Sequence, residues 1–413
     1  MNLDRILSPG YEAHPFLDPD YLQKDEQSAR ALYKSLFEMK KGAVIYTRHL
    51  NRLLRPWNTP HTLAENKALI HLYLREVDLY LRQLLKLMPA GPAAALAPLD
   101  SVTNTNDFLD LMHIAFLGSD RQERFEAQRK LYLAKLFFDV DHSLDVQYGK
   151  DHSAALEACL EQELWSCVSR SRYLTVNYAM AGDGARMDYS IGRPGPFQES
   201  WRVHLRRLKR NVGGRPTVVH VFYYSCRFKR QYRLGHGSHG PEEESGEQQI
   251  WTELQGGRSG SIVSKMIRKG EVDPHKIGDL IGAMFIVKDA GEVEHLQSML
   301  YDIFGGPLRW LEEVDTIRSA AERSRLNEQS AAGYEVRKSL VGLLHHPGDG
   351  RQPYLFSVEF QIYTLEGFLR TVHGRHFASH EKLKLRQFLE GLLPYLFPAR
   401  IYGNDAILRC LEG

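Results

Sequence analysis

The sequence predicts an α+β protein with three consecutive regions. Its 413 residues exceed the usual size of one domain, so two or three folded units are expected. Apolar residues recur at helical spacing over residues 1–165, whereas β-branched and aromatic runs separated by glycine and proline dominate 166–250. Residues 251–413 combine strand-like and helical segments after a glycine-rich turn, which predicts an α/β domain.

The N-terminal region is expected to be a helical bundle. Its clearest helix runs from Leu63 to Met88, where leucines together with Val77 form a broad apolar face. Pro89 and the glycine and proline that follow it end this helix, and the Ala/Pro-rich stretch is expected to be a connector. The connector covers 90–98, and further helices are predicted over 107–118, 121–139 and 153–169.

The middle region is expected to form strands. Residues 172–180, 186–191 and 217–228 are rich in the β-branched and aromatic residues that favour extended structure. The stretch 235–247 (GHGSHGPEEESGE) combines glycine with acidic residues. It predicts a flexible acidic loop that separates this region from the next one.

A basic stretch lies inside the middle region. Residues 201–233 contain ten lysines and arginines and no acidic residue, although the whole chain has a net charge of only +2. Such a segment attracts polyanions, so RNA, tRNA included, is a candidate partner of residues 202–233 if the aromatic rings face outward and stack on bases. The alternative is an ordinary strand whose aromatic residues face the core and whose basic residues are solvated. The aromatic residues in question are Tyr223, Tyr224, Phe228 and Tyr232.

A glycine-rich turn followed by a basic helix predicts a phosphate site. The glycines at 256, 257 and 260 allow tight turning, and Ser261 stands where it could cap a helix whose free amide groups bind phosphate. Lys265 follows one helical turn later, with Arg268 and Lys269 near the same face.

Two predicted strands place carboxylates for metal binding. Asp279 stands just before the apolar run 280–287, which predicts a buried strand. Residues 356–364 alternate apolar and polar side chains, so Glu359 and Gln361 point to one face. If these two strands are neighbours, Asp279 and Glu359 converge on one divalent ion, as metal-assisted phosphoryl transfer requires.

These motifs together resemble the synthetase domain of RelA/SpoT-type alarmone enzymes. That family shows, in this order, Ser-Ile, Lys-Met with basic residues, an Asp-Leu-x-Gly strand, a Gly-Tyr loop and a Glu-x-Gln-Ile-x-Thr strand. The resemblance covers roughly residues 251–390. The matching residues are Ser261-Ile262, Lys265-Met266, Arg268-Lys269, Asp279-Leu280-Ile281-Gly282, Gly333-Tyr334 and Glu359-Phe360-Gln361-Ile362-Tyr363-Thr364.

The resemblance implies a nucleotidyltransferase-like mixed sheet and an Mg²⁺-dependent pyrophosphokinase of the alarmone, or stringent, response. Such an enzyme transfers pyrophosphate from ATP to the ribose 3′-hydroxyl of a guanine nucleotide, and an RNA end is a further candidate acceptor. Asp279 and Glu359 would hold Mg²⁺, and Glu359 would also activate the acceptor hydroxyl. Tyr334 would stack on the acceptor base. The remaining nucleotide-binding residues would be Arg258, Ser261, Lys265, Arg268, Lys269 and Gln361.

Several positions depart from the family pattern. Met284 replaces an arginine, Val336 and Lys338 stand where the family has a serine and a histidine, and Tyr363 replaces another arginine. One family lysine near Arg258 is missing. Each change removes or moves a nucleotide contact. The alternative function is therefore a catalytically silent relative that binds nucleotide or RNA as a regulator. A third is a nucleotidyltransferase of the DNA polymerase beta superfamily, although its paired carboxylates are not found after the turn.

Other classes of function are not expected. The chain has no His-Asp dipeptide of the kind with which alarmone hydrolases hold a metal, so we expect no hydrolase. His376 and His380 lie four apart but lack a third ligand for zinc. The four cysteines form no CxxC pair, and no signal peptide or membrane span is evident, so a cytoplasmic protein is expected.

Overall fold

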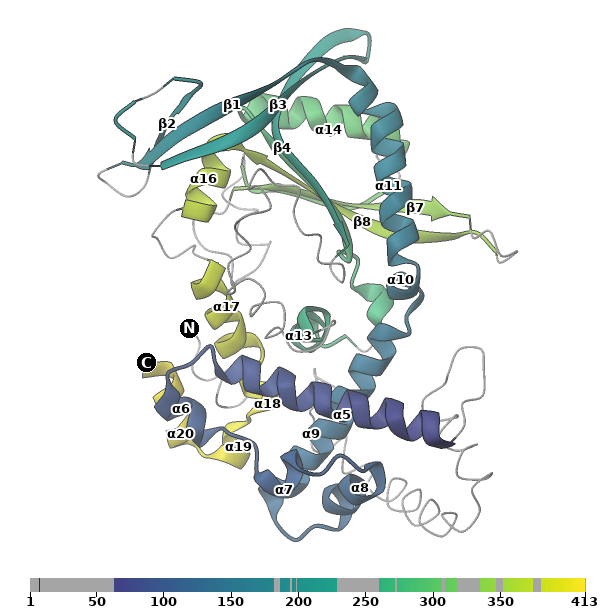
Figure 1. Ribbon diagram of the computed structural model, residues 1–413, viewed down its shortest axis with the longest axis vertical. Coiled ribbons are helices and arrows are strands. Elements are labelled where there is room, and N and C mark those ends of the chain that lie inside the picture. Colours follow the sequence, from purple (N-terminus) through teal and green to yellow (C-terminus); the bar gives the residue numbers. More distant parts are fainter. Residues whose placement is uncertain are drawn as a thin grey trace. The chain divides into compact units, whose positions relative to one another are not determined.

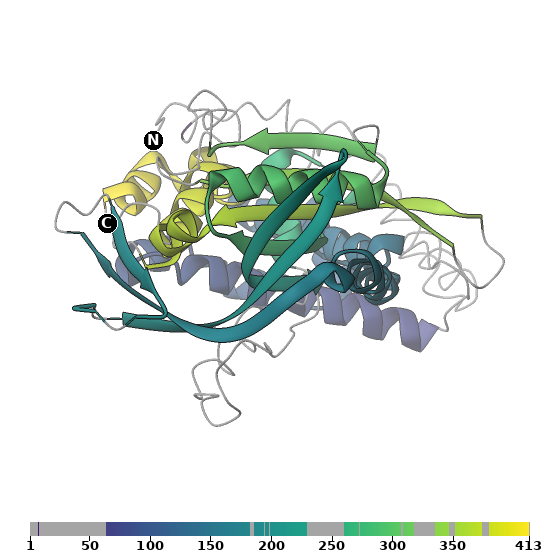
Figure 2. The same cartoon turned by 90° about the horizontal axis from the view of Figure 1, so that it is seen from above.

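A computed structural model gives the arrangement of the chain (Figures 1 and 2). It describes Leu7 and residues 63–181, 186–193, 195–197, 199–228, 260–271, 273–306, 309–317, 335–346, 352–373 and 380–412. The predicted α+β class is confirmed, with helices toward the N-terminus and an eight-stranded mixed sheet. The chain divides into two compact units, and each unit combines segments that are distant in sequence. The division into three regions by sequence stays a prediction about domains.

The helical unit comprises the described parts of Met1–Ser143, Glu244–Ile277 and Lys384–Gly413. The helices expected over 63–88, 107–118 and 121–139 are present, and the predicted connector folds as the short helix α6. The helix expected over 153–169 ends at Glu163, and a strand begins at Val168. The elements are α5 (Leu63–Leu85), α6 (Ala90–Ala95), α7 (Asp100–Thr103), α8 (Phe108–Leu117), α9 (Arg121–Asp141), α13 (Gly260–Lys269), η3 (Pro274–Lys276), α17 (His380–Gly391, most of which belongs here), α18 (Leu393–Leu396), α19 (Ala399–Tyr402) and α20 (Asn404–Glu412).

Helix α9 carries three charged side chains in the interior of this unit, each at most 1% exposed. Lys130 donates to the Asp78 carboxylate at 2.8 Å and to three backbone carbonyls of residues 102, 103 and 105. Glu126 accepts from the Leu99 amide at 2.7 Å and from the Tyr402 hydroxyl at 2.7 Å. Arg129 donates to that same hydroxyl. Because buried charges are tolerated only with such partners, this network ties α9 to α5, α7 and α19.

The sheet unit comprises the described parts of Leu144–Glu243 and Gly278–Leu383. Its strands are ordered β2-β1-β3-β4-β5-β8-β7-β6. The elements are α10 (Leu144–Gln147), α11 (Gly149–Glu163), η2 (Trp165–Cys167), β1 (Val168–Met180), β2 (Met187–Ile191), β3 (Glu199–Val212), β4 (Arg215–Phe228), β5 (Ile281–Val287), α14 (Ala290–Phe304), β6 (Trp310–Asp315), β7 (Arg337–His345), β8 (Tyr354–Thr364) and α16 (Leu365–His373).

The β-rich middle region and the later strands form one continuous sheet. The junction is the antiparallel pairing of β4 with β5, in which Arg227 lies opposite Gly282. Strand β3, which carries much of the basic stretch, and strands β6 and β7 were not anticipated. The alternation in β3 is interrupted by adjacent charged residues such as Arg206 and Arg207, so its sequence lacks a simple strand pattern.

Helices cover the sheet on both faces. Cys226, Ala283 and Phe360 lie in one row across β4, β5 and β8. Helices α11 and α14 pack on this face, because Ser153 contacts Cys226 and the Phe304 ring lies 5.2 Å from that of Phe360. Helix α16 packs on the opposite face, where its leucines 365 and 369 join a core formed by β1–β5 and β8. None of the described helices combines the length and apolarity needed to cross a bilayer.

Candidate functional site

The strand that follows Asp279 is the direct neighbour of the strand that carries Glu359. Strands β5 and β8 pair in parallel, with Gly282 opposite Glu359 and Met284 opposite Gln361. The prediction that Asp279 and Glu359 converge required these two strands to be neighbours, and they are. Asp279 itself lies in a half-buried turn, two residues before β5 begins.

Gly282 allows the two strands to approach closely beside Glu359. A Cβ atom at position 282 would lie 3.0 Å from the Glu359 carbonyl oxygen and 3.8 Å from the Glu359 Cβ. The first distance is tighter than nearly all real Cβ contacts, so a larger residue would push β8 away. Gly282 itself places no side chain between Arg227 of β4 and Glu359 of β8.

Strand pairing assembles a polar surface on this face of the sheet. Residues that pair directly point to the same side, so Arg227, Gly282 and Glu359 form one row across β4, β5 and β8. The next row contains Ser225, Met284, Gln361 and Lys338. We call the polar members of these two rows the sheet-face patch. They are Ser225, Arg227, Lys338, Glu359 and Gln361.

Glu359 is held by its neighbours within the sheet-face patch. Gln361 donates through Nε2 to a Glu359 carboxylate oxygen at 2.5 Å, which confirms that the two side chains share a face. The Tyr363 hydroxyl donates to the Gln361 amide oxygen at 3.3 Å. The Lys338 ammonium lies 3.8 Å from the other Glu359 oxygen, and the Glu359 side chain is 15% exposed. Glu359 is therefore oriented and partly accessible, with one cation beside it.

The structure shows what three residues that depart from the RelA/SpoT pattern contact in this chain. Tyr363 is only 5% exposed and fixes Gln361 through its hydroxyl, so it takes part in orienting Glu359. Lys338 lies directly opposite Gln361 in the β7–β8 ladder, which brings its cation to Glu359. Met284 is half-buried and packs against the apolar core next to the patch.

The basic residues of the predicted phosphate site lie on α13, in the helical unit. The helix buries Ile262, Val263, Met266 and Ile267, and Ser264 shares a 2.7 Å hydrogen bond with Tyr80 of α5. Because α13 begins at Gly260, Ser261 lies in the first turn and not at the cap position that we expected. The polar side of the helix carries Ser261, Lys265, Arg268 and Lys269, none of which is buried.

Several predicted residues lie outside the part of the chain that the structure describes. These are Arg258, Tyr334, Tyr232, the acidic loop 235–247 and His376. Within the described ranges, no group of three or more histidine, cysteine, aspartate or glutamate residues is placed to hold a metal ion. The two carboxylates Asp279 and Glu359 still suit Mg²⁺, which proteins commonly bind through one or two carboxylates together with substrate phosphates.

The aromatic residues proposed to stack on RNA bases face the interior. Phe228 is 4% exposed, and the Tyr224 ring packs against Trp165 at 4.7 Å and Phe285 at 5.2 Å. Tyr223 is half-buried against the apolar core. For these three residues the structure favours the core interpretation of the basic stretch, because Phe228 is buried and the rings of Tyr223 and Tyr224 pack against other residues of the sheet unit.

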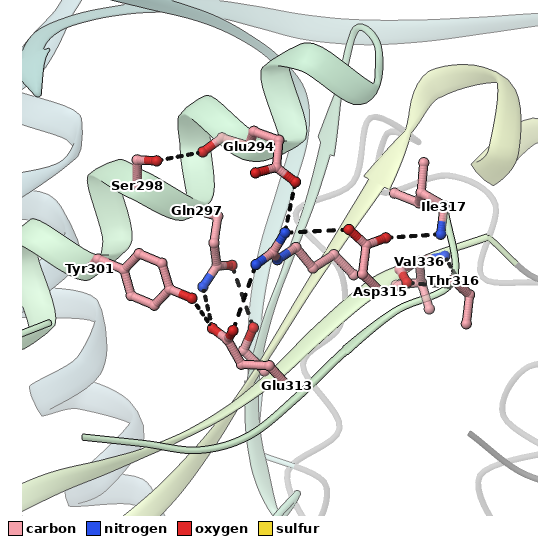
Figure 3. A network of polar contacts seen from close by, with 11 residues as sticks. Glu294, Gln297, Ser298, Tyr301, Glu313, Asp315, Thr316, Ile317 and Val336 are labelled. Carbon is pink, nitrogen blue, oxygen red and sulfur yellow. Dashed lines mark hydrogen bonds and ion pairs between the residues drawn. The ribbon is translucent and has the colours of Figure 1, made fainter. Parts of the chain in front are cut away.

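A second group of carboxylates surrounds Arg337 on the other face of β7 (Figure 3). The Arg337 guanidinium donates to Glu294 at 2.7 Å and to Asp315 at 3.3 Å, and it lies 3.6 Å from Glu313. Gln297 donates to Glu313 at 3.1 Å. Sequence reasoning missed this network, since its members come from α14, β6 and β7 and share no local motif. Arg227 of the sheet-face patch was likewise noted only as part of the basic stretch.

Comparison with known proteins gives a weak structural likeness. The small alarmone synthetase 1 of Bacillus subtilis, in a structure bound to its product pppGpp, is 19% identical to the matching part of this chain. The match covers 37% of this chain and 73% of that one, with a TM-score of 0.23. No protein-family model and no curated protein matches the chain. Likeness at this level establishes neither a family nor an activity.

Proposed function

We propose that this protein is a pyrophosphokinase that transfers the β,γ-pyrophosphoryl group of ATP to a ribose 3′-hydroxyl. The observation that carries the proposal is the parallel pairing of β5 with β8, which sets Glu359 opposite Gly282 of the Asp-Leu-x-Gly motif. The acceptor is a guanine nucleotide or an RNA end. The ordered series of motifs over residues 251–390 supports this class of reaction.

Glu359 is the proposed general base. Its carboxylate accepts the proton of the acceptor 3′-hydroxyl, and the resulting oxygen attacks the β-phosphorus of ATP. The bond between the β-phosphorus and the bridging α,β-oxygen breaks, and AMP leaves with that oxygen. Gln361 and Tyr363 keep the carboxylate oriented through their two consecutive hydrogen bonds. In this role Gln361 positions Glu359 instead of binding the nucleotide itself.

The cations are assigned to the phosphates. Lys265, Arg268 and Lys269 of α13, with Ser261 and with Arg258 ahead of the helix, bind the donor triphosphate. Arg227 adds a cation to the row of Glu359, because Gly282 between them has no side chain.

Asp279 and Glu359 are the residues that would hold Mg²⁺. The bound ion supplies positive charge to the transferred phosphates. Tyr334 is assigned to the acceptor base.

One contact favours a second candidate function, a catalytically silent nucleotide- or RNA-binding regulator. Lys338 places its ammonium 3.8 Å from Glu359, where it competes with a metal ion for the same carboxylate. A silent protein would keep the nucleotide-binding cations while Lys338 neutralises Glu359. The two candidate functions differ in whether pyrophosphate is transferred from ATP to an acceptor.

A transfer experiment separates them. The protein is incubated with Mg²⁺ and with ATP labelled at the β- or the γ-phosphorus, in the presence of GDP, GTP, ADP, AMP or bulk tRNA. Both labels should move together to one acceptor, and Glu359→Gln should abolish the transfer. Glu313→Gln is the matched control, because Glu313 is a sheet carboxylate bound in the Arg337 network. Retained ATP binding without transfer to any acceptor would establish the silent regulator instead.

A further inference from the structure

One aromatic ring of the sheet unit is largely exposed to solvent. Tyr173 of β1 is 63% exposed and is the one aromatic residue among the exposed large hydrophobic residues of the described ranges. His204, directly opposite on β3, stacks against it with ring centroids 4.5 Å apart and planes inclined by 15°. The Arg202 guanidinium lies 5.3 Å from the centre of the Tyr173 ring. The ring is therefore held in place and remains accessible.

The surroundings of this ring are basic. Because side chains alternate along a strand, Arg202, Arg206 and Arg210 of β3 lie on the side of Tyr173, and this side of β1 and β3 carries no acidic residue. Glu199, the one acidic residue of the two strands, lies on the opposite side, where it accepts a 2.9 Å hydrogen bond from the Tyr178 hydroxyl. Arg206, on the same side of β3 as Arg202 and His204, lies over the Trp165 ring at 5.0 Å. A surface of this charge complements a polyanion.

We propose that the exposed face of β1 and β3 around Tyr173, Arg202 and His204 binds single-stranded RNA. We call this face the Tyr173 surface. An unpaired base stacks on the exposed Tyr173 ring, and the arginines bind the phosphates. A base-paired helix keeps the faces of its bases stacked inside and would not offer one to the ring. Ser171 and Thr175 are exposed on β1 and flank Tyr173 on the same face. Their hydroxyl groups can bond the ribose 2′-hydroxyl, which selects RNA over DNA.

The Tyr173 surface is distinct from the sheet-face patch. Leu174 and Val203, the chain neighbours of Tyr173 and His204, pack in the apolar core with Tyr363. Tyr363 shares its sheet face with Glu359 and Gln361, as their hydrogen bonds show. Because side chains alternate along a strand, Tyr173 and His204 point to the other face. RNA binding there does not depend on the proposed transfer reaction.

Fluorescence anisotropy with the full chain tests the proposal. The probes are a fluorescein-labelled 12-nucleotide mixed-sequence RNA, the same sequence as DNA, and the RNA as a duplex. We expect the single-stranded RNA to bind most tightly and its affinity to fall as salt rises, because phosphate contacts release counterions. Tyr173→Ala should weaken it by about tenfold or more, since one base stack is lost, whereas Tyr173→Phe keeps the ring and should stay within about twofold.

Two control variants separate this surface from general charge and from the proposed reaction. Arg215→Met removes an exposed cation at the β3–β4 turn and should change the RNA affinity less than Arg202→Met does. Glu359→Gln should leave RNA binding unchanged, and Tyr173→Ala should leave transfer to a mononucleotide unchanged. Thermal unfolding confirms that each variant is folded.

Three results would overturn the proposal. The first is no binding of single-stranded RNA by the wild-type chain at micromolar concentration and low salt. The second is equal affinity for duplex and single strand together with indifference to Tyr173→Ala, which would indicate charge attraction alone. The third is tighter binding of DNA than of RNA. Loss of transfer activity in Glu359→Gln with retained RNA binding would support both proposals separately.

Discussion

Helix α9 of the helical unit and the two functional surfaces proposed for the sheet unit place their polar side chains in opposite ways. In the helical unit, Glu126, Arg129 and Lys130 lie in the interior, and each has two or more partners. In the sheet unit, Glu359 is partly exposed, and Tyr173 and Arg202 are open to solvent. Removing a buried charge leaves its partners unpaired, so its role is structural, whereas a charge that is oriented but accessible can bind a ligand.

The largest expected difference between a buried and an accessible charge is the effect of replacing Glu359 on the transfer rate. If the sheet-face patch is catalytic, Glu359→Gln should lower the transfer rate by about 10³-fold because the general base is lost. The free energy of unfolding should change little. Initial-rate measurements and denaturant unfolding on the same preparations check both points. A rate loss matched by an equal loss in Glu313→Gln would mean that the sheet carboxylates act only through stability.

Lys130 should show the opposite behaviour. Lys130→Met leaves Asp78 buried beside an apolar side chain and removes the donor to three carbonyls, which should destabilise the protein by about 3 kcal/mol. Burial lowers the pKa of Lys130 and raises that of Asp78, so desolvation outweighs their attraction. Replacing both residues by apolar ones should therefore cost less than Lys130→Met alone.

Denaturant unfolding measures these differences, with Lys135→Met as the matched control. Lys135 pairs with Asp139 one turn along the same helix but is largely exposed, and its loss should cost under about 0.5 kcal/mol. Equal losses of unfolding free energy in Lys130→Met and Lys135→Met would contradict the expected difference between buried and surface charges on α9.

His152 is a buried titratable group of the sheet unit. It is fully buried, stacks on Phe356 at 4.2 Å and shares a 2.8 Å hydrogen bond between Nε2 and the Tyr354 hydroxyl. Its Nδ1 has no hydrogen-bond partner among the described residues. Burial, helped by the nearby His345, lowers the pKa of His152 to about 4.

This shift predicts acid sensitivity. Between about pH 6.5 and 4 the unfolded chain binds a proton at this residue that the folded chain does not, so stability falls as the pH decreases. We expect about 2 kcal/mol of loss from this group between pH 7.5 and pH 5. His152→Phe should flatten the profile of unfolding free energy against pH. A profile as steep as that of the wild type, or flattening by the exposed control His346→Gln, would refute this assignment.

The smallest expected effect concerns Lys338 and sharpens the interpretation of the patch. Lys338→Gln removes the cation 3.8 Å from Glu359, so Mg²⁺ should bind more tightly. Because both side chains are partly exposed, the expected gain is only about threefold in the half-saturating Mg²⁺ concentration. Lys288→Gln, an exposed lysine paired with Asp289, is the control. A rise in the Mg²⁺ requirement would show that Lys338 binds a phosphate group instead.

Local sequence patterns were sufficient for much of the fold. The apolar periodicity of 63–88 and 121–139 predicted α5 and α9, because one face of each helix must meet a core. The alternation in 356–364 predicted β8 and the shared face of Glu359 and Gln361, since a strand has a repeat of two residues. The apolar run after Asp279 predicted β5 for the same local reason.

Only the tertiary structure decided which strands are neighbours. The order β4-β5-β8-β7 brings Arg227 and Lys338 into the rows of Glu359 and Gln361, although they are distant in sequence. The same pairing places the Arg337 network on the face opposite the patch. Tyr224 and Tyr173 share one side of the sheet, but Tyr224 packs against Trp165 and Phe285, whereas Tyr173 stays exposed. Strand pairing depends on long-range packing and hydrogen bonds, which leave no signal within a local stretch of sequence. The sequence alone therefore determined which residues could act as bases, ligands or core, and the fold decided which of them meet.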